Sequence, residues 1–196
     1  MYDRKDALHQ RAKREGYRSR AAYKLLELQR RVRVLRPGFA VVDLGAWPGG
    51  WLQVAAELVG ARGRVVGVDV APIDPLPAPQ VVTLRADVAD AGLPAELRAA
   101  LGRPADVVLC DLAAKLSGVA PRDAARTAEL GGRALAIAAA VLRPGGSLVL
   151  KTFGGTEGEE LRTALRAAYA SVRMLALGAT RKGSAERYLV AVGFHG

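Results

Sequence analysis

The feature that most constrains this chain is a regular alternation, from residue 40 onward, between short apolar segments and longer segments of helical periodicity. Continuous apolar segments predict strands that are buried on both faces, and helices between them predict parallel pairing of those strands. The predicted strands are residues 40–44, 64–70, 81–85, 105–110, 147–152, 172–177 and 187–194. The predicted helices between them are residues 50–58, 94–101, 122–142 and 157–169. The pattern therefore predicts one doubly wound α/β domain with a mostly parallel sheet.

The chain before residue 37 follows a different pattern. Residues 3–14 predict a strongly charged helix, and Ser19 is a candidate N-cap for a second helix with Leu25 and Leu28 on its apolar side. A turn at Arg36-Pro37-Gly38 ends this region. We therefore predict a basic N-terminal helical extension over residues 1–36 and an α/β domain over residues 37–196.

Positive charge is concentrated in this extension. Residues 1–36 hold 12 lysines and arginines against 4 acids, whereas the other residues hold 17 against 15. Most of the net charge of +10 thus lies in a short segment, which is the electrostatic pattern expected for a polyanionic partner such as nucleic acid. The alternative is a solvated basic helix in a chain that is rich in arginine throughout.

Composition excludes several classes of protein. A single cysteine, Cys110, allows no disulfide scaffold, and two histidines far apart in the sequence, His9 and His195, give no metal-ligand cluster. The longest apolar runs are far shorter than the roughly 20 residues that span a bilayer, and no hydrophobic stretch follows the basic N-terminus. We expect a soluble, cytoplasmic protein that needs no metal and no membrane.

A glycine-rich segment follows the first predicted strand, where ligands of such sheets bind. Residues 43–51 read DLGAWPGGW, and the spacing of Gly45 and Gly49 matches neither the dinucleotide fingerprint nor a P-loop. The spacing favours a nucleoside ligand without a pyrophosphate. Asp69 would then accept hydrogen bonds from a ribose diol, and Asp87 from an adenine amino group. The alternatives are that Asp43 and Asp69 only satisfy turns and that Trp51 is a core residue.

A second set of charged residues is expected at the same edge of the sheet. Asp111 and Lys151 end neighbouring strands, Glu186 precedes the last strand, and Lys24 lies on the predicted second helix. A lysine at the end of an apolar strand is costly unless it is paired or functional. A neighbouring positive charge favours the uncharged form of a lysine, which is the form that acts as a base. The alternative is a pair of ordinary salt bridges.

Six separated blocks resemble the FtsJ family of S-adenosylmethionine-dependent methyltransferases, which methylate ribose 2′-hydroxyls of RNA. They are residues 15–28 (EGYRSRAAYKLLEL), 43–51 (DLGAWPGGW), 67–69 (GVD), 111–118 (DLAAKLSG), 148–153 (LVLKTF) and 181–188 (RKGSAERY). The resemblance spans nearly the whole chain in the family's order. It implies a Rossmann-like methyltransferase fold, with a mostly parallel seven-stranded sheet and an antiparallel last strand.

The resemblance also implies roles for individual residues. The catalytic residues are Lys24, Asp111, Lys151 and Glu186, with Lys151 as the proton acceptor. The residues that bind S-adenosyl-L-methionine are Asp43, Gly45, Gly49, Gly50, Trp51, Asp69, Asp87 and Asp111. Two departures stand out: Trp47 replaces a small residue beside the cofactor's methionine end, and Ala114-Lys115 replaces a Pro-Asn pair near the substrate.

By the same resemblance, the expected substrate is a uridine of 23S ribosomal RNA in the large ribosomal subunit, held through phosphate contacts of the basic extension. No obligate protein partner is evident. Three alternatives remain: a transfer RNA substrate, an RNA-binding protein of the same fold that has lost catalysis, and a small-molecule methyltransferase.

Overall fold

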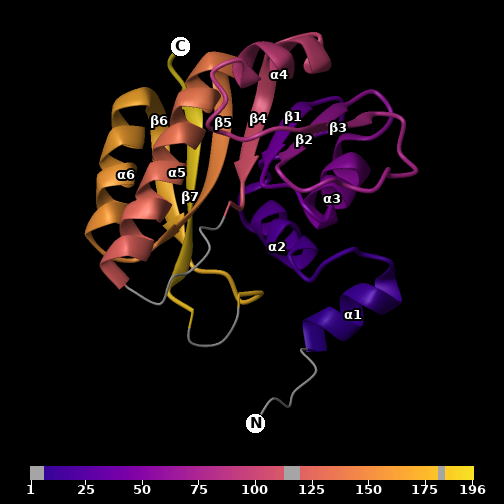
Figure 1. The fold of residues 1–196 in the computed structure, drawn as a ribbon, viewed down its shortest axis with the longest axis horizontal. Helices are drawn as coiled ribbons and strands as arrows, with labels where there is room; N and C mark the ends of the chain where they lie inside the picture. The colour runs from indigo at the N-terminus through magenta and orange to yellow at the C-terminus, as the bar shows by residue number, and fades with distance from the viewer. Residues whose placement is uncertain (1–6, 113–119, 181–183) are drawn as a thin grey trace.

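A seven-stranded mixed sheet forms the centre of the molecule (Figure 1). The computed structural model describes residues 7–112, 120–180 and 184–196. The strands are β1 (Ala40–Leu44), β2 (Arg64–Asp69), β3 (Val81–Arg85), β4 (Ala105–Cys110), β5 (Leu142–Phe153), β6 (Tyr169–Leu175) and β7 (Glu186–Phe194). Their order is β3-β2-β1-β4-β5-β7-β6, and only β7 runs antiparallel to its neighbours. The expected mostly parallel sheet with an antiparallel last strand is confirmed.

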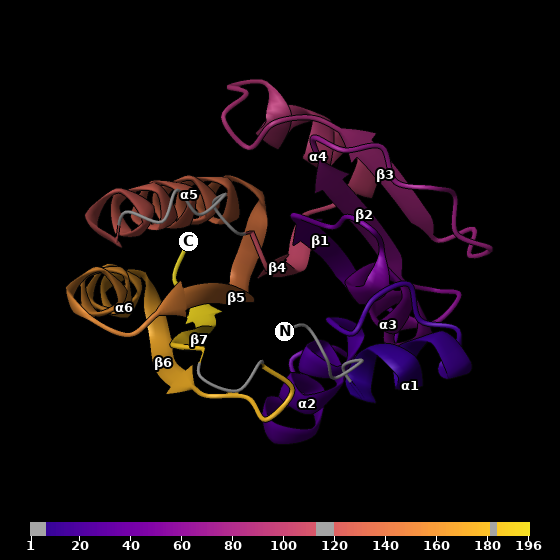
Figure 2. The same cartoon turned by 60° about the horizontal axis from the view of Figure 1, so that its bottom comes forward.

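Helices cover both faces of this sheet. They are α1 (Ala7–Glu15), α2 (Ala22–Val32), α3 (Gly50–Val59), α4 (Leu93–Leu101), α5 (Ala120–Val141) and α6 (Thr156–Ala168). Figure 2 shows α4, α5 and α6 over one face and α2 and α3 over the other, with α1 outside α2 and α3. Within the described ranges, none of these helices combines the length and the apolar character that crossing a membrane requires.

Strand β1 contributes side chains to the hydrophobic cores on both faces of the sheet. All five of its residues are buried. Ala40, Val42 and Leu44 pack on the side of α4 and α5, and Val41 packs on the side of α2 and α3. Because side chains alternate along a strand, Asp43 lies on the same face as Val41. An acid is thus buried beneath α2 and α3.

Helix α2 belongs to this second core rather than to a separate arm. Ala22, Leu25 and Leu28 are fully buried there, and the chain continues through buried Leu35 into β1. Helix α1 packs outside it, with Ala12 against Tyr23. A functional boundary at residue 36 therefore stays a prediction, and residues 3–6 of the predicted first helix lie outside the described residues.

Two details of the predicted elements are wrong. Ser19 does not cap α2, because backbone hydrogen bonds from Ala22 to Ser19 and from Tyr23 to Arg20 already satisfy the first amides in a tight turn. Tyr169 is not helical but begins β6 in an extended conformation. Its ring packs 5.2 Å from that of Phe194, centroid to centroid, so a tertiary contact decides the end of α6.

Strand β5 begins at Leu142, earlier than predicted, and its register against β4 shifts between Ala105 and Val107. Helix α5 ends at Val141, one residue earlier than predicted, and β5 has already begun where the Pro-Gly-Gly segment is reached. The Pro-Gly-Gly segment therefore lies within the irregular strand β5.

Candidate active site

The N-terminal extension is fastened to the glycine-rich loop after β1. The Trp51 indole Nε1 donates a 2.7 Å hydrogen bond to the carbonyl of Ala21, and the Arg18 amide donates a 2.8 Å bond to Gln53 Oε1. Gln53 Nε2 donates in turn to the carbonyl of Gly16. Trp51 is 3% exposed and lies in the core, so it orders the extension against α3.

Two glycines of the loop allow this close approach. Gly49 has a φ of 111°, and a Cβ there would lie 2.9 Å from Arg18 Nη1. A Cβ on Gly50 would collide with Ser19 Oγ. The glycines therefore make room for the 16–21 segment.

The Arg18 side chain bonds both to the glycine-rich loop and to the connection after β2. Its guanidinium donates 2.6 Å hydrogen bonds to the carbonyls of Asp74 and Pro75, in the connection after β2, and a 3.3 Å bond to the carbonyl of Pro48. One side chain thus joins the extension, the glycine-rich loop and the proline-rich connection. Sequence analysis missed this residue, because backbone carbonyl acceptors leave no sequence signal.

Unpartnered buried polar atoms gather beside the loop. Both carboxylate oxygens of Asp43 and the Oγ of Ser19 are buried and have no hydrogen-bond partner among the described residues. Burial, reinforced by the charges of Asp111 and Asp69, raises the pKa of Asp43 well above its usual range. A buried acid without a partner is costly, so these atoms fit a ligand that brings a positive group and a hydrogen-bond acceptor.

The two other predicted acids have different surroundings. Asp69 accepts backbone hydrogen bonds from Trp47 at 3.0 Å and from Ala71 at 2.9 Å, so it does satisfy a turn. Each of its carboxylate oxygens still has capacity for another donor. Asp87 is exposed and accepts a 2.9 Å bond from the Ala89 amide. Trp47 is 58% exposed, so its ring does not fill the loop's interior.

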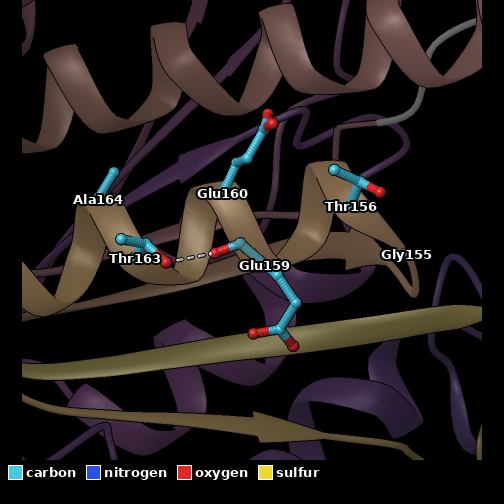
Figure 3. Close-up of a pocket in the computed structure, with 6 residues that line it drawn as sticks. All are labelled: Gly155, Thr156, Glu159, Glu160, Thr163 and Ala164. Atoms are coloured by element: carbon cyan, nitrogen blue, oxygen red, sulfur yellow. Dashed lines mark hydrogen bonds between the residues drawn. The ribbon is translucent and has the colours of Figure 1, made fainter.

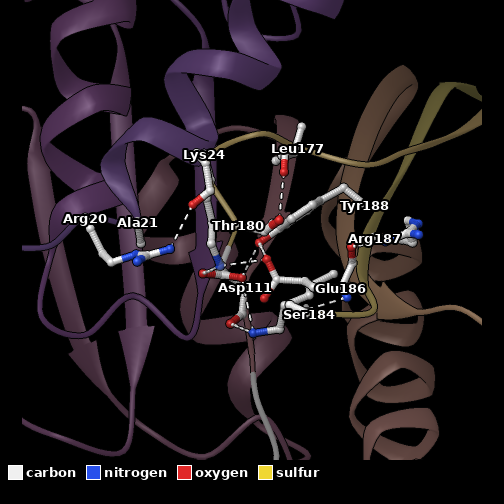
Figure 4. A network of polar contacts seen from close by, with 12 residues as sticks. Arg20, Ala21, Lys24, Asp111, Leu177, Thr180, Ser184, Glu186, Arg187 and Tyr188 are labelled. Atoms are coloured by element: carbon white, nitrogen blue, oxygen red, sulfur yellow. Dashed lines mark hydrogen bonds and ion pairs between the residues drawn. The ribbon is translucent and has the colours of Figure 1, made fainter. Parts of the chain in front are cut away.

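The four charged residues predicted to meet at the mouth of the sheet do come together. Figure 4 labels three of them, Lys24, Asp111 and Glu186. Lys151 Nζ lies 2.6 Å from the carbonyl oxygen of Asp111 and 3.2 Å from its Oδ1. Lys24 Nζ lies 2.8 Å from Glu186 Oε1 and 3.6 Å from Asp111 Oδ2. Asp111 therefore stands between the two lysines. We call these four residues the tetrad.

Tyr188 is a fifth member of the cluster that sequence analysis missed. Its hydroxyl lies 2.7 Å from Asp111 Oδ1 and 3.0 Å from Glu186 Oε1 and donates to this pair. Burial, together with the two carboxylates, raises the pKa of Tyr188, so the hydroxyl keeps its proton. Two signals pointed to it: Tyr188 follows Glu186 by two residues in a strand, and it pairs in register with Lys151.

A separate hollow of about 840 Å³ lies on the surface of α6, lined by Gly155, Thr156, Glu159, Glu160, Thr163 and Ala164. In Figure 3 the carboxylates of Glu159 and Glu160 point away from each other, and Thr163 bonds only to the Glu159 carbonyl of its own helix. These side chains do not converge on a common point. The tetrad and the glycine-rich loop remain the candidate active site.

Comparisons with known proteins agree with this geometry. The chain is 45% identical to Ribosomal RNA large subunit methyltransferase E of Acidithiobacillus ferrooxidans, over 98% of this chain and 87% of that protein. It is 49% identical to the protein of the same name from Paramagnetospirillum magneticum, over 94% of this chain and 77% of that protein.

Solved structures extend the likeness to the fold. A Plasmodium falciparum protein described as a ribosomal RNA methyltransferase is 28% identical and superposes with a TM-score of 0.80, over 92% of this chain and all of that one. Aeropyrum pernix fibrillarin, solved with bound S-adenosyl-L-methionine, is 17% identical with a TM-score of 0.60, over 87% of this chain and 76% of that chain, and shares the fold. The family model for FtsJ-like methyltransferases matches residues 17–194. Together with the relatives that are almost half identical over nearly its whole length, this match shows that the chain belongs to the FtsJ-like methyltransferase family.

Proposed function

We propose that this protein transfers a methyl group from S-adenosylmethionine to a ribose 2′-hydroxyl of large-subunit ribosomal RNA, at a uridine of the 23S molecule. The observation that carries the proposal is the placement of Lys151. Its side chain is 5% exposed, and Nζ is fixed by two oxygens of Asp111 at the edge where the glycine-rich loop also lies. A buried, oriented amine beside a ligand loop suits proton transfer from a weakly acidic hydroxyl.

The residues around the loop fit the cofactor. When bound, S-adenosylmethionine supplies an electrophilic methyl group on a positively charged sulfur. We assign the unpartnered Asp43 carboxylate to the cofactor's ammonium group and Ser19 Oγ to its carboxylate, since both are buried donors or acceptors without a partner in the described chain. Asp69 and Asp87 are assigned to the ribose diol and the adenine amino group. Gly45, Gly49 and Gly50 give these groups room.

The four residues of the tetrad have different roles in activating the hydroxyl. Lys151 accepts the hydroxyl proton at Nζ while the hydroxyl oxygen takes the methyl group. Asp111 holds Nζ in place through its carbonyl and carboxylate. Lys24 and Glu186, paired at 2.8 Å, orient the ribose. Holding the two reacting groups in line supplies much of the acceleration.

An RNA substrate is supported by two independent features. The relatives named above are ribosomal RNA large subunit methyltransferases, and the sequence places most of its net positive charge in residues 1–36. That segment leads directly into the tetrad through Lys24. A ribosomal substrate also agrees with the cytoplasmic location expected from the sequence.

The test uses tritiated S-adenosylmethionine and ribosomal subunits from a strain that lacks the gene. We expect label in large-subunit RNA, on a single ribose 2′-hydroxyl, and none in small subunits. Isothermal titration calorimetry with the cofactor serves as the control for a folded protein. Label on transfer RNA alone would replace the proposed substrate, and cofactor binding with no label on any RNA would overturn the proposed reaction.

Removing the Tyr188 hydroxyl tests how the tetrad is held. We expect Tyr188→Phe to lower kcat about tenfold, because Asp111 and Glu186 lose their shared donor and the carboxylates shift relative to Lys151. The cofactor dissociation constant should change less than twofold. Tyr23→Phe, which removes a hydroxyl bonded to Glu15 outside the tetrad, is the matched control and should keep the wild-type kcat. An unchanged kcat in Tyr188→Phe would show that the hydroxyl is dispensable.

A further inference from the structure

Apart from Lys13 and Arg14, which are exposed on α1, the described basic side chains of the extension divide into two groups. One group is committed to partners within the protein: Arg11 to Glu15, Arg18 to backbone carbonyls, Arg20 to the Ala179 carbonyl, Lys24 to the tetrad and Arg31 to Glu27. Arg30, Arg33 and Arg36 form no ion pair with any acid in the described ranges, and all three are exposed. The extension is therefore not one uniform basic surface.

These three arginines surround one hollow. It has a volume of about 520 Å³ and is lined by Gln29, Arg30, Arg33, Leu35 and Arg36. We call it the α2–β1 pocket, because it lies where α2 ends and the chain turns toward β1. Arg33 follows Lys24 by nine residues, which places it roughly 13 Å along the helix axis from the tetrad. The pocket and the tetrad thus lie toward opposite ends of α2.

The loop that carries the arginines is held in one shape by its own hydrogen bonds. The Gln29 side chain accepts a 2.9 Å bond from the Leu35 amide and donates a 2.8 Å bond to the Leu35 carbonyl. The Arg33 amide donates to the Gln29 carbonyl at 2.9 Å, and Arg33 has left-handed backbone angles, φ 48° and ψ 46°. Because this backbone is already fixed, binding an anion costs no further backbone entropy, and only the three arginine side chains have to be ordered.

The neighbouring acid cannot neutralise the pocket. Glu27 accepts 3.0 Å hydrogen bonds from the amides of Gly178 and Ala179 and pairs with Arg31, so its carboxylate is already used. The pocket consequently presents three positive charges to solvent. Guanidinium groups in this arrangement match phosphate oxygens in charge and in hydrogen-bond geometry.

We propose that the α2–β1 pocket binds phosphate groups of the RNA backbone, as an anchor separate from the tetrad. This inference rests on the proposed RNA substrate. The anchor binds RNA flanking the target nucleotide, and α2 sets the spacing between the anchored phosphates and the reacting ribose. It contributes affinity and register without reading base sequence.

The test compares two double variants of equal charge. Arg30→Gln/Arg36→Gln alters the pocket, and Arg62→Gln/Arg166→Gln removes two exposed arginines elsewhere on the surface. Binding to large ribosomal subunits is measured by co-sedimentation at several salt concentrations. We expect the pocket variant to bind about tenfold more weakly and its slope of log affinity against log salt to fall by about 1.5, as for the loss of two phosphate contacts. The control should stay within twofold of wild type.

Two further measurements separate this proposal from the proposed function. The cofactor dissociation constant and kcat at saturating subunits should be unchanged in the pocket variant. Arg33→Gly supplies a third variant: glycine suits the left-handed backbone, so the whole Arg33 side chain is removed without straining the turn, and binding to subunits should weaken as in the pocket variant. Equal binding by the pocket variant and the control would overturn the anchor while leaving the reaction intact. Failure of the wild-type protein to bind or label RNA would overturn both.

Discussion

Replacing Lys151 with alanine is expected to lower kcat by about a thousandfold, within the range that positioned proton acceptors contribute. The cofactor dissociation constant should change less than threefold, because among the described residues Lys151 bonds to Asp111 and to none of the glycine-rich loop. The measurement is single-turnover transfer of tritiated methyl to large ribosomal subunits, with calorimetry for cofactor binding.

A second variant separates loss of the amine from loss of packing. Lys151→Met keeps the apolar stem of a residue buried in β5 and should be as inactive as Lys151→Ala, while unfolding closer to the wild-type temperature. Arg62→Ala removes an exposed basic side chain outside the extension; it is the control and should keep full kcat. Wild-type transfer rates in Lys151→Met would mean that another group accepts the proton.

Short strands were the most predictable part of this fold. The bounds of β1, β3 and β4 coincide with the predicted segments, because a mainly apolar run of five or six residues flanked by turn residues has few other stable arrangements. Errors fall where local preference and tertiary packing disagree. Tyr169 has helical neighbours on one side, yet its contact with Phe194 draws it into β6.

The tetrad could be predicted because its members end or begin elements whose positions follow from topology. Asp111 follows β4, Lys151 lies near the end of the adjacent parallel strand β5, and Glu186 begins the antiparallel strand paired with β5. The parts that sequence analysis missed depend on three-dimensional detail. Ser19 was assigned to a helix cap and instead lies unpartnered against Gly50, since the turn before α2 satisfies its own amides. Residues Ala114 and Lys115, which depart from the family pattern, lie outside the described residues.

Asp43 shows how a ligand site can oppose the stability of the fold. The carboxyl group is fully buried on the α2 side of β1, with two unpartnered oxygens and with Asp69 and Asp111 as its charged neighbours. Its pKa is raised in the folded protein, so the unfolded chain loses this proton at a lower pH than the folded chain does. Above the ordinary pKa of an aspartate, the free energy of unfolding therefore falls as pH rises, until the folded form also ionises.

Asp43→Asn is accordingly expected to change stability and cofactor affinity in opposite directions. Without cofactor at pH 8, the free energy of unfolding should rise by about 1–3 kcal/mol, because a neutral amide costs less to bury than a carboxylate. Between pH 5 and pH 8, the free energy of unfolding should fall less steeply with pH than in the wild type. The difference in slope should be about the slope that one titrating group contributes. The cofactor should bind about 100-fold more weakly, since the ammonium group loses its charged partner.

Urea unfolding across pH and calorimetry measure the two effects. Glu160→Gln, an exposed acid on α6, should alter neither. If Asp43→Asn binds cofactor as tightly as wild type, the ammonium group is held elsewhere, and the unpartnered carboxylate has a purely structural cause.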